Sequence, residues 1–143
     1  MTEPIDLAYA AGIIDGEGSI SISVAQPNYG RNSPYYYVLV KVGNTDLVLV
    51  NWLRKSFGGS IQTHEYNNSK WKTLYTWSLS TQQAARFLED ILPYLKLKWE
   101  QAEIALNLCS VTSSCNREGL SDLDINYRQV LKEAMHILNK RGV

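Results

Sequence analysis

Two carboxylates lie two residues apart, at Asp15 and Glu17, where a short helix is expected to end, with Gly16 and Gly18 beside them. The C-terminal end of a helix carries partial negative charge and unpaired carbonyls, so acidic side chains there cost roughly 0.3–1 kcal/mol each. A hard divalent cation would remove this conflict, because carboxylate and carbonyl oxygens are the ligands that Mg²⁺ prefers. The segment therefore predicts a metal site, and an ordinary helix end followed by a glycine turn is the alternative.

The same helix has a face of small residues, made by Ala8, Ala11 and Gly12. Residues three and four apart lie on one side of a helix, so these three positions are aligned. Such a face permits the close approach of a second helix backbone. Packing of the alanines beneath a sheet explains it equally well.

The hydrophobic pattern predicts one α+β domain over residues 1–143. Helices are expected over residues 6–14, 47–57, 81–92, 98–111 and 121–140, strands over 19–24, 35–42, 60–66 and 73–79, and a loop over 112–119. Asp6 is the expected N-cap of the first helix, and Thr45 or Asp46 that of the second. The order is an αββαββα core with C-terminal helices. Because the strands are joined as hairpins, we expect an antiparallel sheet with the helices on one face.

Strand periodicity separates a core face from an open face of this sheet. Ile20, Ile22 and Val24 are expected in the core. The open-face candidates for contact with a partner are Ser19, Ser21, Ser23, Tyr35, Tyr37, Lys41, Ser60, Gln62, His64, Tyr66, Lys72, Thr76 and Ser78. Leu39 and Leu74 share this parity, which fits either apolar contact with a partner or curvature of the core. For His64 a plain exposed strand position is an equal alternative.

Charge is unevenly distributed although the net charge is zero. Residues 19–80 hold six basic and two acidic residues, and the acidic residues concentrate in the flanking segments. A basic middle suits a protein that presents one face to phosphate, although such a stretch is also common on ordinary surfaces.

Several classes of protein are disfavoured by the sequence. No apolar run is long enough for a membrane helix, and no basic start precedes an apolar stretch, so an intracellular protein is expected. Cys109 and Cys115 have no metal-ligand spacing and are expected to be reduced, buried or incidental thiols. His136 is expected to be structural, and no arrangement typical of zinc binding or of a Ser/His/Asp triad is found.

Residues 10–18, Ala-Ala-Gly-Ile-Ile-Asp-Gly-Glu-Gly, resemble the motif of the LAGLIDADG homing endonucleases. Ala10 stands where that motif usually has Leu, and an alternating strand follows the segment as it does in the family. Residues 93–98, Pro-Tyr-Leu-Lys-Leu-Lys, look like a second family segment. The αββαββα order matches the family's core, in which the curved sheet forms a DNA-binding saddle.

The resemblance implies roles for individual residues. Glu17 corresponds to the metal ligand, with the Gly16 carbonyl as a further ligand of Mg²⁺ or another divalent cation such as Mn²⁺. Lys98 corresponds to the basic residue near the scissile phosphate, and Asn44 to a polar residue that organises water. A polar residue in a turn is the alternative for Asn44. Asp15 is expected either to support the metal ligand or to cap the helix locally.

The resemblance also implies a homodimer, since in that family a chain with a single motif supplies half of the catalytic centre. The expected interface residues are Ala8, Ala11, Gly12 and Asp15. By resemblance the expected activity is a staggered double-strand break in a long pseudo-palindromic DNA site, with no small-molecule cofactor. The gene is expected to be intron-encoded, in a prokaryotic cytoplasm or an organelle. The alternatives are an RNA maturase, a non-cleaving DNA-binding protein of the same fold, and a protein-interaction domain.

Overall fold

The computed structural model describes residues 2–27, 33–112 and 121–140. Its elements, in chain order, are α1 (Pro4–Glu17), β1 (Gly18–Ala25), β2 (Tyr35–Asn44), α2 (Leu47–Phe57), β3 (Ser60–His64), β4 (Leu74–Ser80), α3 (Thr81–Ile91), the 3₁₀ turn η1 (Leu92–Tyr94), α4 (Trp99–Thr112) and α5 (Asp122–Lys140). The predicted αββαββα order with C-terminal helices is confirmed.

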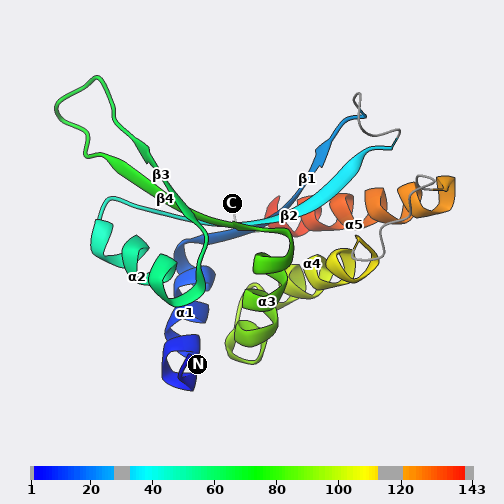
Figure 1. The fold of residues 1–143 in the computed structure, drawn as a ribbon, viewed down its shortest axis with the longest axis horizontal. Helices are drawn as coiled ribbons and strands as arrows, with labels where there is room; N and C mark the ends of the chain where they lie inside the picture. Colours follow the sequence, from blue (N-terminus) through cyan, green and yellow to red (C-terminus); the bar gives the residue numbers. More distant parts are fainter. Residues whose placement is uncertain (1, 28–32, 113–120, 141–143) are drawn as a thin grey trace.

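The four strands form one antiparallel sheet in the order β1-β2-β4-β3. The β1–β2 and β3–β4 ribbons rise on opposite sides, and the helices lie beneath the sheet (Figure 1). The sheet is therefore the curved saddle that the sequence predicts. Its open face carries a row across all four strands, in which Ser19 pairs with Lys41, Lys41 with Ser78, and Ser78 with Ser60.

The core lies between the sheet and the helices. Alternate strand residues point into it, and Ile20, Val40 and Trp77 have at most 1% of their surface exposed. The helices contribute fully buried side chains from α1, α2, α3 and α4, among them Ile14, Leu53, Leu88 and Leu108. Ile22 is buried as predicted, whereas Val24 is only half-buried because it lies near the end of its strand.

Helix α1 is longer than the sequence predicts at both ends. It begins at Pro4, with Glu3 at the cap position, so Asp6 lies in the first turn and is not the N-cap. Proline favours the first helical position because its fixed φ suits the helix and it has no N–H to leave unpaired. At the other end the helix continues through Glu17, and the Gly18 N–H donates to the carbonyls of Ile13 and Ile14.

Helix α2 has the predicted bounds. The Asp46 carboxylate accepts a hydrogen bond from the Val48 N–H at 2.9 Å, which selects Asp46 over Thr45 as the N-cap. The helix ends at Gly58, whose positive φ of 82° suits glycine. The Gly58 carbonyl then accepts a hydrogen bond from Nε1 of the buried Trp77 at 2.8 Å.

The β3–β4 connection is longer than predicted, because β3 ends at His64 and β4 begins at Leu74. Tyr66 and Thr73, predicted as strand residues, therefore lie in the connection, and so does Lys72, a predicted contact residue of this hairpin. A turn at Asn68 causes the difference, since its backbone carbonyl accepts from the Trp71 N–H at 3.1 Å.

The C-terminal helices brace the sheet from the helix side. The Asn139 side chain of α5 donates to the Ile20 carbonyl at 3.0 Å, and the Tyr36 hydroxyl donates to Gln129 at 2.8 Å. Cys109 is buried in α4, as predicted, and His136 is exposed on α5; Cys115 lies outside the described residues. Among the described helices, none combines the length and the hydropathy that a membrane span requires.

Gly18 is the residue that the α1–β1 junction requires. A Cβ atom at this position would lie 2.7 Å from the Ile14 Cα, whereas a Cβ at Gly16 would meet nothing within 4 Å. We therefore expect Gly18→Ala to lower the free energy of unfolding by about 1–3 kcal/mol, because the backbone must shift to relieve the contact. Gly16→Ala should leave it unchanged or raise it by up to about 1 kcal/mol, because alanine favours a helix.

Urea unfolding of both variants, followed by circular dichroism, measures the difference. Equal stability of the two variants would contradict the packing described at Gly18.

Candidate active site

Glu17 and Asn44 meet where α1 ends and β2 ends. The Asn44 Nδ2 donates to the Glu17 Oε2 at 2.9 Å. The Asn44 Oδ1 accepts from the Asp46 N–H at 2.7 Å, which fixes the orientation of the amide and turns its NH₂ group toward Glu17. Asn44 is thus more than a polar residue before α2. The structure brings together two of the residues that the sequence assigns to one site.

Glu17 remains exposed, and its other carboxylate oxygen has no hydrogen-bond partner among the described residues. A hydrogen-bonded but solvent-facing carboxylate is held in place and still open to a ligand. The Gly16 peptide, also exposed, lies next to it at the end of α1. This arrangement offers oxygen ligands of the kind that Mg²⁺ prefers.

Asp15 has a different role from Glu17, because side chains two apart on a helix point in different directions. Its Oδ2 accepts from the Lys96 N–H at 2.7 Å, and its Oδ1 accepts from the N–H groups of Leu97 and Lys98 at 3.2 and 2.9 Å. Asp15 therefore caps the segment that leads into α4. The predicted local cap of α1 is therefore not what these bonds form, because they act on residues 96–98 and not on the end of the helix that carries Asp15.

Lys98 lies at the start of α4, half-buried, and reaches back to the end of α1. Its Nζ donates to the Ile14 carbonyl at 3.0 Å and also to the Gly18 carbonyl. Burial lowers the pKa of Lys98 below its usual range, and the nearby Asp15 carboxylate opposes this shift. The ammonium thus satisfies carbonyls at the helix end and places a positive charge near the Asp15 carboxylate.

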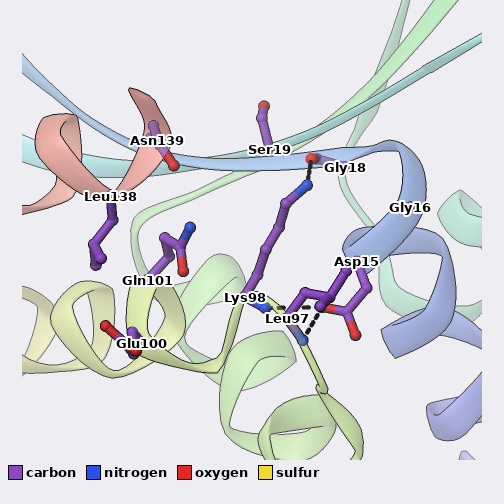
Figure 2. A pocket seen from close by; sticks show the side chains of 10 residues that line it. All are labelled: Asp15, Gly16, Gly18, Ser19, Leu97, Lys98, Glu100, Gln101, Leu138 and Asn139. Carbon is purple, nitrogen blue, oxygen red and sulfur yellow. Dashed lines mark hydrogen bonds between the residues drawn. The ribbon is translucent and has the colours of Figure 1, made fainter. Parts of the chain in front are cut away.

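A cavity of about 760 Å³ opens beside this lysine. Figure 2 shows the Lys98 side chain extending along it to Gly18, with Asp15 at one end and Asn139 of α5 at the other. The remaining lining residues are Gly16, Ser19, Leu97, Glu100, Gln101 and Leu138. Glu17 and Asn44 do not line it, so the end of α1 separates the Glu17–Asn44 pair from the Asp15–Lys98 pair.

Asn139, Gln101 and Glu100 are site residues that the sequence does not indicate. They belong to the C-terminal helices, which reach the α1–β1 junction only through tertiary packing. The sequence carries no spacing or motif at these positions that marks them. Only the position of Lys98, one residue before α4, suggests that this helix approaches the site.

The described residues offer few side chains that could bind a metal. Within residues 2–27, 33–112 and 121–140, no group of three or more His, Cys, Asp or Glu side chains converges. Mg²⁺ is often held by one or two carboxylates together with waters and substrate phosphates, so a single Glu17 with the Gly16 carbonyl fits half of such a site.

The predicted DNA-contact residues of the strands lie on the open face, as their parity requires. Residues with this parity are Ser19, Ser21, Ser23, Tyr35, Tyr37, Lys41, Ser60, Gln62, His64, Thr76 and Ser78, and their cross-strand partners share the face. Tyr35 and Tyr37 stack with ring centroids 5.7 Å apart. Leu39 lies among them, half-buried and paired with Ser21 and Ser80.

The predicted dimer interface on α1 is wrong at Ala11. Ala11 has 0% of its surface exposed and packs in the core of its own chain, so it has no surface to offer a partner. Ala8 and Gly12 are exposed. The Asp15 carboxylate is engaged by the backbone of its own chain.

The titration of Lys98 tests this geometry. We expect a pKa below that of an exposed lysine, and a further decrease in Asp15→Asn, because that change removes the negative charge that opposes the effect of burial. The charged form would then persist at low pH and be lost as the pH rises, earlier in the variant than in the parent protein. NMR of ¹³C-labelled lysine in EDTA-containing buffer measures the Lys98 pKa in the parent protein and in Asp15→Asn. An increase in the Lys98 pKa in Asp15→Asn would contradict this assignment.

Comparison with solved structures places this site in a known fold. No family model and no curated protein matches the sequence. The homing endonuclease I-CvuI, in complex with its target, superposes with a TM-score of 0.78 at 19% identity, over 94% of this chain and 82% of that one. The archaeal intron-encoded homing endonuclease I-Vdi141I, complexed with DNA, superposes with a TM-score of 0.78 at 15% identity. The match covers 99% of this chain and 89% of that one. The I-SmaMI LAGLIDADG homing endonuclease, bound to cleaved DNA, superposes with a TM-score of 0.70 at 17% identity. The match covers 91% of this chain and 43% of that longer one. The resemblance inferred from residues 10–18 is confirmed at the level of architecture, and the chain has the fold of the LAGLIDADG homing endonucleases.

Proposed function

We propose that this protein is a divalent-metal-dependent DNA endonuclease that acts as a homodimer and makes a staggered double-strand break in a long pseudo-palindromic site. The observation that carries the proposal is the exposed Glu17 carboxylate that Asn44 holds at the end of α1, with Lys98 bonded to a carbonyl of the same helix end. The fold supports this proposal, since the homing endonucleases I-CvuI, in complex with its target, and I-Vdi141I, in complex with DNA, have the same fold.

Glu17 and the Gly16 carbonyl would hold the cation, with Mg²⁺ or Mn²⁺ as the best fit to an all-oxygen site. A bound divalent cation supplies Lewis acidity at the scissile phosphate. Asn44 keeps one oxygen of Glu17 in a fixed position through its 2.9 Å hydrogen bond. A carboxylate that is already held in position needs less rearrangement, and so less free energy, when DNA binds.

Lys98 provides the positive charge for the reaction. Its ammonium lies next to the carbonyls of Ile14 and Gly18, so it can stabilise negative charge that develops on a phosphate bound at the cavity. Its lowered pKa also makes it a better proton acceptor than an exposed lysine. Asp15 acts through Lys98 as a positioning residue, because it holds the backbone from which that side chain extends.

Dimerisation is supported by the outer face of α1. A Cβ at Gly12 or at Gly16 would meet nothing within 4 Å, so the fold of one chain does not require glycine at either position. Each glycine costs a helix roughly 1 kcal/mol relative to alanine. Ile5, 78% exposed, and Ala8 extend the same face toward the N-terminus. A second α1 packed there would explain both glycines and would bring the Glu17 residues of the two copies toward a common axis.

The open sheet face is the proposed DNA-reading surface. Two-stranded ribbons fit the major groove, and alternate side chains of a strand can reach base edges. Gln62 and Thr76 are paired across β3 and β4, and Lys41 lies between Ser19 and Ser78. This mixture of amide, hydroxyl and ammonium groups offers donors and acceptors to the bases.

Glu17→Gln tests the assignment of the metal ligand. We expect cleavage to fall by at least about 100-fold while DNA binding persists, because a cation contributes several kcal/mol to the transition state and the amide is a poor ligand for it. The Glu17→Gln protein is first used to select duplexes that it binds from a randomised library. The wild-type protein should then linearise a plasmid that carries the selected site, in Mg²⁺ but not in EDTA.

Glu103→Gln is the matched control, since Glu103 is an exposed carboxylate on α4 outside the cavity and should cleave like the wild type. Cleavage by Glu17→Gln at the wild-type rate would refute its catalytic role. Selection that enriches no duplex would refute DNA recognition itself. Specific binding by the wild type without cleavage would instead identify a non-cleaving DNA-binding protein.

Gly12→Leu tests the proposed α1 interface. The leucine has room in one chain and favours the helix, so the fold should persist, but it would block the close approach of a second α1. We expect self-association to weaken by at least about tenfold, or 1.4 kcal/mol. Sedimentation over a range of concentrations measures the change, with Asn107→Leu on the exposed side of α4 as the control. A wild-type protein that stays monomeric throughout, also with DNA, would exclude the homodimer.

A further inference from the structure

The end of the β3–β4 ribbon is built around a defined turn. The Asn68 backbone carbonyl accepts from the Trp71 N–H at 3.1 Å, and the Asn68 Oδ1 accepts from the Lys70 N–H at 3.1 Å. An asparagine side chain that bonds to the backbone two residues on is a common way to stabilise a turn. Residues 64–72, here called the ribbon arm, are therefore preorganised rather than an open connection.

Three aromatic rings are packed edge-to-face along the ribbon arm. The centroids of His64 and Tyr66 are 4.5 Å apart, and those of Tyr66 and Trp71 are 5.1 Å apart. Trp71 has 62% of its surface exposed, although it carries the largest apolar side chain in the arm. A turn that only joins two strands needs no such cluster, since small polar residues suffice. The rings support an indole that is presented to a partner.

The arm lies on the same face as the predicted DNA-contact residues. His64 has the parity of Ser60 and Gln62, whose side chains lie on the open face. The ribbon rises from the sheet opposite the β1–β2 ribbon, so the arm stands at one rim of the saddle (Figure 1). An object bound in the saddle would therefore lie near the ribbon arm.

Basic residues flank Trp71 in the sequence. Lys70 and Lys72 are exposed immediately before and after Trp71, and Glu65 is the one acidic residue of the arm. An apolar residue with a basic residue on each side in the chain suits a deoxyribose with its two phosphates. Bidentate contacts to base edges call for amides or guanidinium groups. The arm has no arginine, the Asn68 Oδ1 is used in the turn, and Asn67 is the remaining amide.

We propose that the ribbon arm grips the sugar–phosphate backbone of duplex DNA independently of base sequence, with Trp71 against a sugar and Lys70 and Lys72 on the adjacent phosphates. This inference rests on the proposed function, since it requires duplex DNA in the saddle. It adds a contact that sets affinity without taking part in base recognition or in the chemistry at Glu17.

Binding to a short random-sequence duplex tests the arm without knowledge of the cognate site. We expect Trp71→Ala to weaken binding by about tenfold, equivalent to 1.4 kcal/mol. The pair Lys70→Gln/Lys72→Gln should reduce the slope of log K against log salt by about 2, close to 0.9 for each phosphate contact that is lost. Duplex should also quench tryptophan fluorescence in the wild type and not in Trp71→Phe.

The controls are Tyr127→Ala, an exposed aromatic on α5, and Lys55→Gln/Lys132→Gln, which removes the same charge from α2 and α5. Unchanged thermal melting of the arm variants would confirm that they fold. Wild-type binding with unchanged affinity and salt slope in the arm variants would overturn this proposal and leave the proposed function standing. No salt-sensitive duplex binding by the wild type would overturn both. Quenching by single-stranded but not by duplex DNA would show stacking on unpaired bases and would also overturn the arm's proposed role.

Discussion

The acceptance of three backbone N–H groups by the Asp15 carboxylate is the interaction on which the site depends. It joins the C-terminal end of α1 to the segment before α4, more than eighty residues away. The negative end of one helix would repel this carboxylate, but the positive end of the other attracts it. Lys98 adds a second contact between the same two segments, because its Nζ donates a hydrogen bond to the Ile14 carbonyl. Together these contacts define where the first strand begins and where the lysine points.

These contacts between α1 and the segment before α4, here called the α1–α4 joint, also explain why Asp15 and Glu17 have different surroundings. Asp15 faces the segment before α4 and accepts three hydrogen bonds. Glu17 faces solvent and, among the described residues, accepts one hydrogen bond, from Asn44. A helix turn lets two carboxylates in close sequence serve opposite sides, one structural and one open to ligands. Asn44 is in turn held by the backbone before α2, so the outward carboxylate is supported by the second strand as well as by its own helix.

The sequence predicts most of the fold because the strand alternation and the helix ends are strong local signals. Ile20 and Ile22 alternate with serines, and Asp46 and Gly58 mark both ends of α2. Local patterns fail where tertiary contacts decide. They do not show that Ala11 is buried, that Asp15 bonds to residues 96–98, or that Asn139 reaches β1. They also place Asp6 at a cap, because an acidic residue in the first turn and one at the cap look alike in sequence.

The separation of the two sheet faces has a consequence for how such a protein changes over time. Ser19, Lys41, Ser78 and Ser60 form a row that contributes little to the buried core, which is made by the alternate residues of the same strands. Mutations in this row can therefore accumulate at small cost in stability. The residues at the end of α1, Glu17, Asn44 and Lys98, lie outside this row and would be unaffected by such changes. Under the proposed function, a lineage could thus follow a diverging DNA target by exchanging the side chains of one surface, while the residues proposed to cut DNA stay the same.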